Sequence, residues 1–152
     1  MKGDIDRSVV PSLDLHNFMG RWYEVARFDH SFERGMSNVT AEYILQPDGK
    51  VRVINRGVRD GKQVEAIGKA KTTAEPGRLR VSFFMFFYSD YNILEMGQNG
   101  EWVLIGSRSP KYLWILSRKP KISNEVINHI LQLARERGYD TSKLIFDANY
   151  VE

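Results

Sequence analysis

The stretch Gly20-Arg-Trp-Tyr-Glu-Val-Ala26 opens the first of a series of strand-like segments and decides the fold that we expect. A second stretch, Tyr112-Leu-Trp-Ile-Leu-Ser-Arg118, closes the last of these segments before a helical pattern begins. Gly20 lets another part of the backbone pass close by. The guanidinium of Arg118 can stack on the indole of Trp22, a contact worth about 0.5–2 kcal/mol. Since the two motifs lie far apart in sequence, their meeting would close one end of a barrel, and such a cup suits a small-molecule carrier.

Short strand-like segments fill the chain between these motifs. Turn residues such as Pro47-Asp-Gly49 and Asp60-Gly61 separate them. Eight short strands joined by tight turns predict an antiparallel meander, as a barrel or a sandwich. We expect the strands at 21–30, 38–46, 50–58, 63–73, 78–84, 87–95, 102–108 and 111–118.

One long segment has the periodicity of a helix. Ser123 is its expected N-cap and Gly138 its expected end. Apolar residues recur at helical spacing from Ile127 to Ala134, so this helix should pack on the outside of the sheet. A brief strand is expected at 144–146, and Asp14 is expected to cap a short turn before the first strand.

Composition narrows the classes of function. A chain of 152 residues has the size of one domain, and we expect a flexible lead-in over 1–12 and a single domain over 13–152. The net charge of +3 comes without a long basic run, which argues against nucleic acid as a partner. The absence of cysteine excludes disulfides and thiolate metal sites. His16, His30 and His129 lie in different expected elements, so no metal site is predicted.

Alternation along the strands places small residues on the expected inner face. Ala41, Ala66, Gly68 and Ala70 would leave space inside an eight-stranded barrel, which can hold one small ligand. Larger side chains from across the barrel would fill that space instead. The alternation pattern therefore does not distinguish a barrel with an internal cavity from a barrel with a filled core.

Three motifs in this order resemble those of the lipocalin family: Gly20-x-Trp22, Ser89-Asp90-Tyr91 and Ser117-Arg118 before a helix. The run from Trp22 to Gly35 is similar to the bacterial branch of that family. The resemblance extends over roughly residues 13–147. It implies an all-β fold, namely an eight-stranded antiparallel up-and-down barrel with one C-terminal flanking α-helix.

The resemblance also implies a function. Bacterial lipocalins are typically outer-membrane lipoproteins that bind fatty acids or lysophospholipids, so the implied partner is a hydrophobic small molecule and the implied location is the outer membrane or periplasm. Lipid transport, storage and envelope maintenance are the roles that fit, and no cofactor is implied. Two features depart from the branch. The lipidated cysteine is absent, with no signal segment or lipobox in this chain, and Met85-Phe86 replaces the Gly-Pro that many relatives have between the fifth and sixth strands.

Tyr112 and Trp114 share the alternation of Arg118 and should point into the barrel. A buried phenol or indole needs a hydrogen-bond partner, so either could orient a ligand, although both could equally be ordinary core aromatics. With the resemblance, the residues expected to contact a ligand are Phe28, Ala41, Tyr43, Val53, Asn55, Ala66, Phe83, Phe86, Tyr91, Tyr112 and Trp114. Gly20, Trp22 and Arg118 are assigned to closing the barrel instead.

The run from Phe83 to Tyr88 cannot turn all of its large side chains inward. In a meander that starts at the closed end, this turn lies at the open mouth, together with the cations Arg34, Arg59, Lys62 and Arg108. We therefore expect a hydrophobic and basic mouth. Its aromatic side chains would contact acyl chains, and its cations would attract the phosphate or carboxylate headgroups of a ligand or of a membrane surface. The alternative is a turn packed within the protein or in a homodimer contact, with a solvated ring of charges.

Glu24 shares the alternation of Trp22 and could be an inward carboxylate, paired with Arg118 or with a tyrosine. Because no second acid or nucleophile accompanies it, it is a poor general base, and no catalytic residue is predicted. No phosphate-binding glycine loop or nucleophile elbow is present either. A binding protein is therefore favoured over an enzyme acting on a bound lipid, or over an interaction module with a filled barrel.

Overall fold

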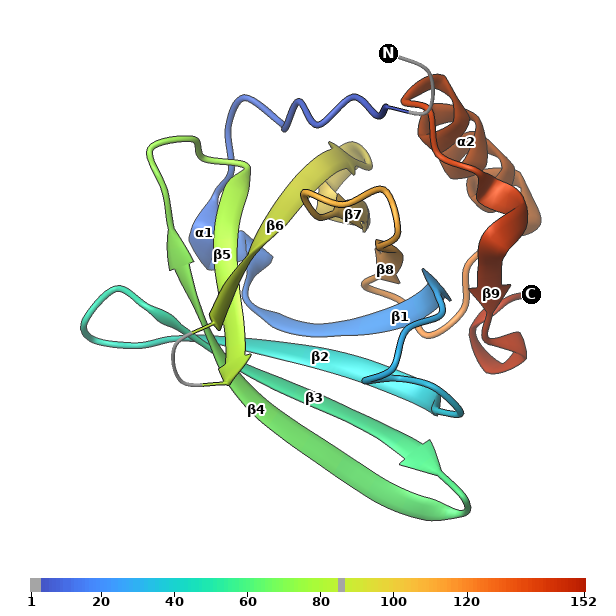
Figure 1. The fold of residues 1–152 in the computed structure, drawn as a ribbon, viewed down its shortest axis with the longest axis horizontal. Helices are drawn as coiled ribbons and strands as arrows, with labels where there is room; N and C mark the ends of the chain where they lie inside the picture. Colours follow the sequence, from blue (N-terminus) through green and yellow to red (C-terminus); the bar gives the residue numbers. More distant parts are fainter. Residues whose placement is uncertain (1–3, 85–86) are drawn as a thin grey trace.

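The computed structural model of the protein describes residues 4–84 and 87–152, and it shows a closed β-barrel with a helix on its flank (Figure 1). The predicted fold class is confirmed. The candidate ligand contact Phe86 and the turn Met85-Phe86 lie outside the described residues. The elements are α1 (Leu15–Phe18), β1 (Gly20–Phe28), β2 (Ser37–Leu45), β3 (Val51–Arg59), β4 (Lys62–Thr72), β5 (Arg78–Phe84), β6 (Phe87–Met96), η1 (Gln98–Gly100), β7 (Trp102–Gly106), β8 (Leu113–Ser117), α2 (Asn124–Glu136), η2 (Thr141–Lys143), β9 (Leu144–Phe146) and η3 (Ala148–Tyr150).

Each barrel strand pairs antiparallel with the next, and β1 closes the barrel by pairing with both β2 and β8. Trp22 lies opposite Ala41 of β2, and Tyr23 lies opposite Ser117 of β8. β9 adds a ninth strand to the sheet by pairing with the far end of β1. The stretch Gly20–Ala26 and the stretch Tyr112–Arg118 therefore lie side by side in the wall of one barrel.

The described residues form two hydrophobic cores. One fills the closed end of the barrel and includes Phe18, Trp22 and Ile93. The other lies between the outer wall and α2, where Ile130 and Ala134 of the helix are fully buried. The helix begins as predicted, since the Val126 N–H donates to Ser123 Oγ at 3.3 Å.

A β-bulge in β1 changes which side chains enter the barrel. The register with β8 shifts between Glu24 and Ala26, so Val25 and Ala26 both face the outer core. Phe28 consequently lies in the outer core, with its ring centroid 6.2 Å from that of Tyr139. The expectation that Phe28 lines the interior is wrong, because strict alternation does not hold across a bulge.

The barrel wall is open along part of β4. This strand pairs with β3 from Lys62 to Ala70, but with β5 only from Lys69 to Thr72. Among the described residues, the first half of β4 therefore has no strand partner on its β5 side, and the β3–β4 hairpin extends away from the barrel (Figure 1). Ala66, opposite Asn55 on the inner face, is exposed for this reason.

Residues 4–10 form no helix or strand, yet they contact the barrel. Ile5 is buried, the Asp6 N–H donates to the Arg137 carbonyl at 2.8 Å, and the Val10 N–H donates to the Ile93 carbonyl at 3.0 Å. These contacts lay the lead-in along β6 and the end of α2. No helix among the described residues is long and apolar enough to cross a membrane.

Candidate functional site

The floor of the barrel is an aromatic cluster held by one guanidinium. Phe18 stacks on Tyr43 with ring centroids 5.2 Å apart, and the Trp22 indole N–H donates to the Phe18 carbonyl at 2.9 Å. The Arg118 guanidinium lies 3.9 Å from the centroid of Trp22, as expected, and donates hydrogen bonds to the carbonyls of Arg21 and Asn17. It thereby ties β8 to α1 and β1 across the closed end.

Gly20 fits this closure for two reasons. Its φ of 96° lies in the region that favours glycine, and a Cβ there would lie 3.4 Å from Arg118 Nη1. A side chain at this position would strain the backbone and would contact the guanidinium.

Two phenols form a polar pair above the floor. The Tyr43 and Tyr91 hydroxyls are 2.7 Å apart, and both rings face the interior. Burial raises the pKa of both tyrosines, so both hydroxyls keep their protons at neutral pH. One hydroxyl can satisfy the other while still presenting a free lone pair to a ligand.

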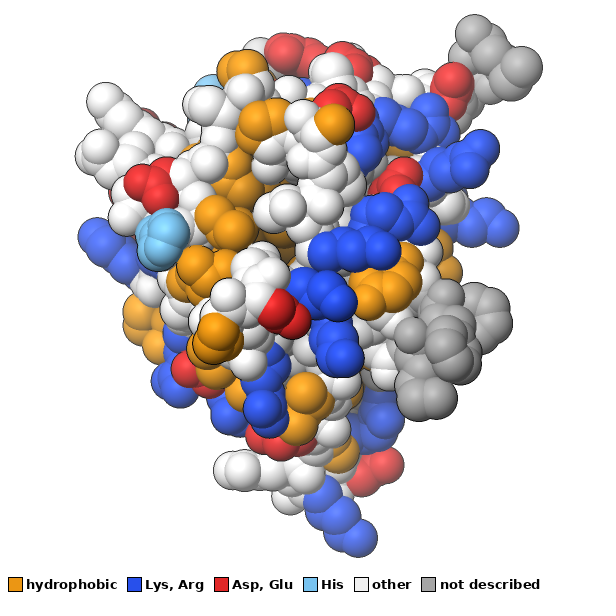
Figure 2. All heavy atoms as spheres, turned by 90° about the vertical axis from the view of Figure 1, so that its left-hand side faces the viewer, with side chains coloured by type: hydrophobic (Ala, Val, Ile, Leu, Met, Phe, Trp, Pro, Cys, Tyr) orange, Lys and Arg blue, Asp and Glu red, His pale blue; other side chains and the backbone are white. Residues whose placement is uncertain are grey.

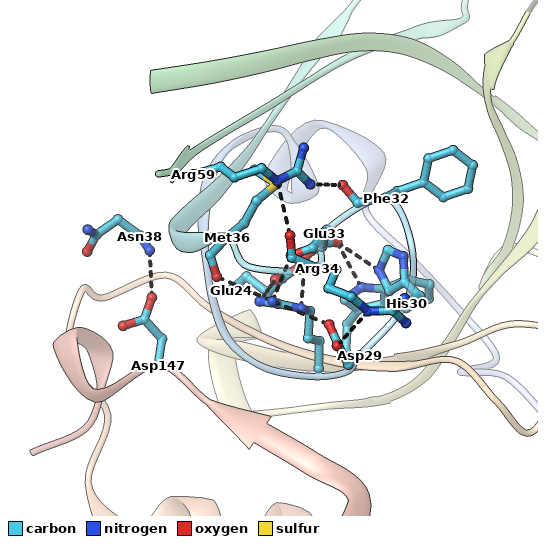
Figure 3. Close-up of polar contacts among 12 residues, drawn as sticks. Glu24, Asp29, His30, Phe32, Glu33, Arg34, Met36, Asn38, Arg59 and Asp147 are labelled. Carbon is cyan, nitrogen blue, oxygen red and sulfur yellow. Dashed lines mark hydrogen bonds and ion pairs between the residues drawn. The ribbon is translucent and has the colours of Figure 1, made fainter. Parts of the chain in front are cut away.

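A second polar group, which we call the mouth cluster, lies nearer the open end and consists of Glu24, Arg27, His30, Glu33 and Trp114. Figure 3 labels Glu24, His30 and Glu33 of this cluster. The Trp114 indole N–H donates to Glu33 Oε1 at 3.3 Å, and His30 Nε2 lies 3.2 Å from the same oxygen. Arg27 Nη2 donates to the carbonyls of Glu33 and Met36 at 2.8 and 3.3 Å. A guanidinium in the barrel wall therefore anchors the β1–β2 loop, residues 29–36.

The two carboxyl groups of the mouth cluster have opposite protonation. Burial raises the pKa of Glu24 well above its usual value, and a hydrogen bond to the nearby charge of Glu33 raises it further. Burial opposes ionisation of Glu33 too, but hydrogen bonds from Glu24 and His30 outweigh it and lower the pKa of Glu33 to about 2. Glu24 is thus the protonated member and Glu33 the ionised one. Glu24 pairs with Arg27 and Glu33, not with Arg118 or a tyrosine as expected from sequence.

The mouth cluster keeps unused hydrogen-bonding capacity. Glu24 Oε2, Arg27 Nε, His30 Nδ1 and Glu33 Oε2 are buried and make no hydrogen bond of normal geometry among the described residues, although Glu24 Oε2 lies 3.5 Å from Arg27 Nη1 and Glu33 Oε2 lies 3.7 Å from Arg27 Nε. Such atoms inside a cup can meet the polar end of a ligand. Tyr112 stacks on Trp114 with centroids 6.0 Å apart, and the ring of His30 meets both edge-on.

The structure brings most of the predicted ligand contacts to the interior. Ala41, Tyr43 and Val53 are buried there. Asn55, Phe83, Tyr91, Tyr112 and Trp114 are half-buried, whereas Ala66 is exposed beside the opening in the wall. Sequence reasoning missed Arg27 and Glu33. The available signal was a charged residue, Arg27, within an otherwise apolar end of the first strand.

Two of the four predicted mouth cations are engaged in holding the β1–β2 loop. Arg34 pairs with Asp29 at 3.2 Å, and Arg59 donates to the carbonyls of Arg34 and Phe32 at 3.0 and 2.8 Å. The Phe32 ring lies 6.2 Å from the ring of His30, centroid to centroid, and this side chain is 62% exposed. Lys62 and Arg108 are exposed. The hydrophobic part of the mouth thus includes Phe32, which sequence reasoning did not single out.

Fold and site together define the class of protein: a small up-and-down barrel whose cup has an aromatic floor and a polar mouth. A family model described as a lipocalin-like domain matches residues 13–149. The protein therefore belongs to the lipocalin family, in its bacterial outer-membrane lipoprotein branch.

The similar proteins support this placement. Outer membrane lipoprotein Blc of Escherichia coli (strain K12) is 44% identical over 143 residues, which are 91% of this chain and 81% of the relative. Outer membrane lipoprotein Blc of Vibrio cholerae serotype O1 is 42% identical over 142 residues, covering 90% of this chain and 83% of the relative. The names of these relatives agree with the expected location in the cell envelope.

Solved structures of lower identity share the fold. Insecticyanin from the tobacco hornworm Manduca sexta superposes with a TM-score of 0.75 at 20% identity, over 98% of this chain and 90% of that chain. Lobster apocrustacyanin A1 gives a TM-score of 0.73 at 19% identity, over 88% of this chain and 78% of that chain.

Proposed function

We propose that the protein is a lipid carrier that holds the acyl chain of a fatty acid or lysophospholipid in its barrel, for lipid transport, storage or envelope maintenance. The observation that carries the proposal is that the interior of the cup becomes more polar along its length, from an apolar aromatic floor to the polar mouth cluster. An amphiphile changes in the same way along its length, from an apolar tail to a polar headgroup. Each buried CH₂ group contributes on the order of 0.8 kcal/mol, so a long chain needs few specific contacts.

The proposed ligand contacts follow from this orientation. The acyl chain would lie against Ala41, Val53 and Phe83, with the Tyr43–Tyr91 hydroxyl pair beside it. Its polar end would reach the mouth cluster and the exposed cations Lys62 and Arg108. Nothing in this arrangement pairs a nucleophile with a general base, so we propose binding rather than turnover.

Blocking the cup on its inner face tests the proposal. Ala66→Trp places an indole on the inner face at the opening, whereas Glu65→Trp places the same indole one residue away on the outer face. If the indole displaces two CH₂ groups of the ligand, affinity falls about fifteenfold. We expect that loss for Ala66→Trp and less than about a threefold change for Glu65→Trp.

The measurement is displacement of a fluorescent fatty acid from delipidated protein, followed by native mass spectrometry of the complex. Equal affinities for the two variants would contradict binding inside the barrel. Conversion of the bound lipid to a product of different mass would show the protein to be an enzyme.

A further inference from the structure

The outer wall of the barrel carries a band of cations that the lipid cup does not use. Cross-strand register on the outward face sets Arg52 of β3 beside Lys69 of β4, and Lys71 of β4 beside Arg80 of β5. Lys50 lies just before β3 at the same end of the hairpin. We call Lys50, Arg52, Lys69 and Lys71 the wall cations. In Figure 2, which views the side of β5 and of the β2–β3 turn, Lys and Arg side chains form a band next to hydrophobic ones.

Among the described residues the wall cations form no ion pair, unlike their neighbours. Arg80 pairs with Asp90 at 2.6 Å, and Arg56, nearer the mouth on the same face, contacts both Glu42 and Glu65 at 2.9 Å. Within residues 4–84 and 87–152, no ion pair is formed by any of the four wall cations, and all four are exposed. Their charge is therefore available to an external anion.

A groove of about 840 Å³ lies next to these charges. Lys50, Arg52 and Lys69 line it together with Ile67 and Tyr88, and the lining also includes Asp48 and, where the groove reaches the inner face, Phe83. Ile67 is 49% exposed, and the Lys71 ammonium lies 4.3 Å from the centroid of the Tyr88 ring. Positive charge and accessible apolar surface thus share one face, which is the combination that binds the interface of an anionic bilayer.

We propose that the outer face of β3, β4 and β5 docks onto an anionic phospholipid surface through the wall cations, with Ile67 entering the interface. The mouth is the weaker candidate for this contact, because Arg34 and Arg59 are engaged with the β1–β2 loop. The wall cations point away from the interior, so docking uses charges other than the groups proposed to contact the ligand. A protein docked by its wall keeps its mouth at the side, free for ligand exchange.

Vesicle co-sedimentation tests the proposal. The vesicles are phosphatidylcholine alone or phosphatidylcholine with roughly one-third phosphatidylglycerol, at low and moderate ionic strength. We expect binding to the anionic vesicles only, weakened by salt. Each lysine or arginine near such a surface contributes about fivefold, so Arg52→Gln/Lys69→Gln/Lys71→Gln should lower the partition coefficient roughly a hundredfold.

Two control variants make the result specific. Lys119→Gln/Lys121→Gln/Lys143→Gln removes the same net charge from exposed positions away from the band, and should change partitioning less than about threefold. Arg34→Gln/Arg59→Gln/Lys62→Gln removes the mouth cations. All three variants are checked for thermal unfolding and for fatty-acid affinity, so that a failure of docking and a failure of the lipid-carrier proposal give different results.

Several outcomes would overturn docking through the wall. Equal binding to neutral and anionic vesicles, or equal losses in the wall variant and the Lys119/Lys121/Lys143 variant, would remove the role of this face. A loss confined to the mouth variant would move the contact to the mouth. Tighter binding to duplex DNA than to anionic vesicles, lost in the wall variant, would make the face a nucleic-acid site instead.

Discussion

Glu24 is a carboxyl group buried in the barrel wall with 7% of its surface exposed, and its pKa is raised while that of the neighbouring Glu33 is lowered. Because burial raises the pKa of Glu24, the folded state retains a proton that the unfolded chain releases near pH 4.5. Stability should therefore fall as pH rises above that value, by at most about 1.4 kcal/mol per pH unit. Glu33, whose pKa is lowered to about 2, acts in the opposite sense and loses its stabilising effect as pH falls from about 4.5 to 2.

The substitution Glu24→Gln tests whether the free energy of unfolding falls as pH rises because of Glu24. The amide can donate the same hydrogen bond to Glu33 and has no proton to lose. We expect the variant to match the parent in free energy of unfolding below about pH 4.5 and to become progressively more stable than the parent as pH rises above that value. Urea unfolding across this range gives the measurement, with the exposed Glu101→Gln as control. A parallel pair of curves for Glu24→Gln and the parent would mean that Glu24 is ionised in the folded state.

At the scale of elements, the bulge in β1 assigns Phe28 to the outer core beneath α2. Phe28→Ala should lower the free energy of unfolding by about 3–5 kcal/mol while leaving fatty-acid affinity unchanged, because the lost contacts lie outside the cup. Chemical denaturation and ligand titration of the same preparation measure both quantities. Phe28→Leu should recover most of the stability. An affinity loss in both variants, with stability intact, would return Phe28 to the interior.

The elements themselves could be predicted closely, and the site less so. Turn chemistry such as Asp60-Gly61 marks strand ends, so the segment expected at 63–73 was found at 62–72. No residue pattern marks the bulge at Val25. Because of this bulge, the side chains that follow it in β1 point to the opposite face from the one that strict alternation predicts. The inward position of Glu33 depends on a tertiary contact with Arg27, and loop residues carry no periodicity from which to infer it.

At the scale of the whole molecule, Arg118 joins β8 to α1 and β1 and so holds the closed end together. Arg118→Gln should lower the free energy of unfolding by about 1–3 kcal/mol, since it removes a cation–π contact and charged hydrogen bonds. Ligand selectivity should be unchanged, because the guanidinium lies beneath the floor. The measurements are urea unfolding and a fatty-acid chain-length series, with the exposed neighbour Lys119→Gln as control. A changed chain-length preference at constant stability would instead place Arg118 in contact with the ligand.

The stretch of β4 that has no strand partner on its β5 side within residues 4–84 and 87–152 has a consequence for how copies of this protein meet. An unpaired strand edge offers N–H and C=O groups that another chain can extend into a shared sheet, which is how many β proteins begin to aggregate. Here Lys62 and Glu65 lie on that edge, both exposed, and such charges oppose the approach of a second backbone. These two exposed charges thus protect a crowded solution of the protein from assembling edge to edge.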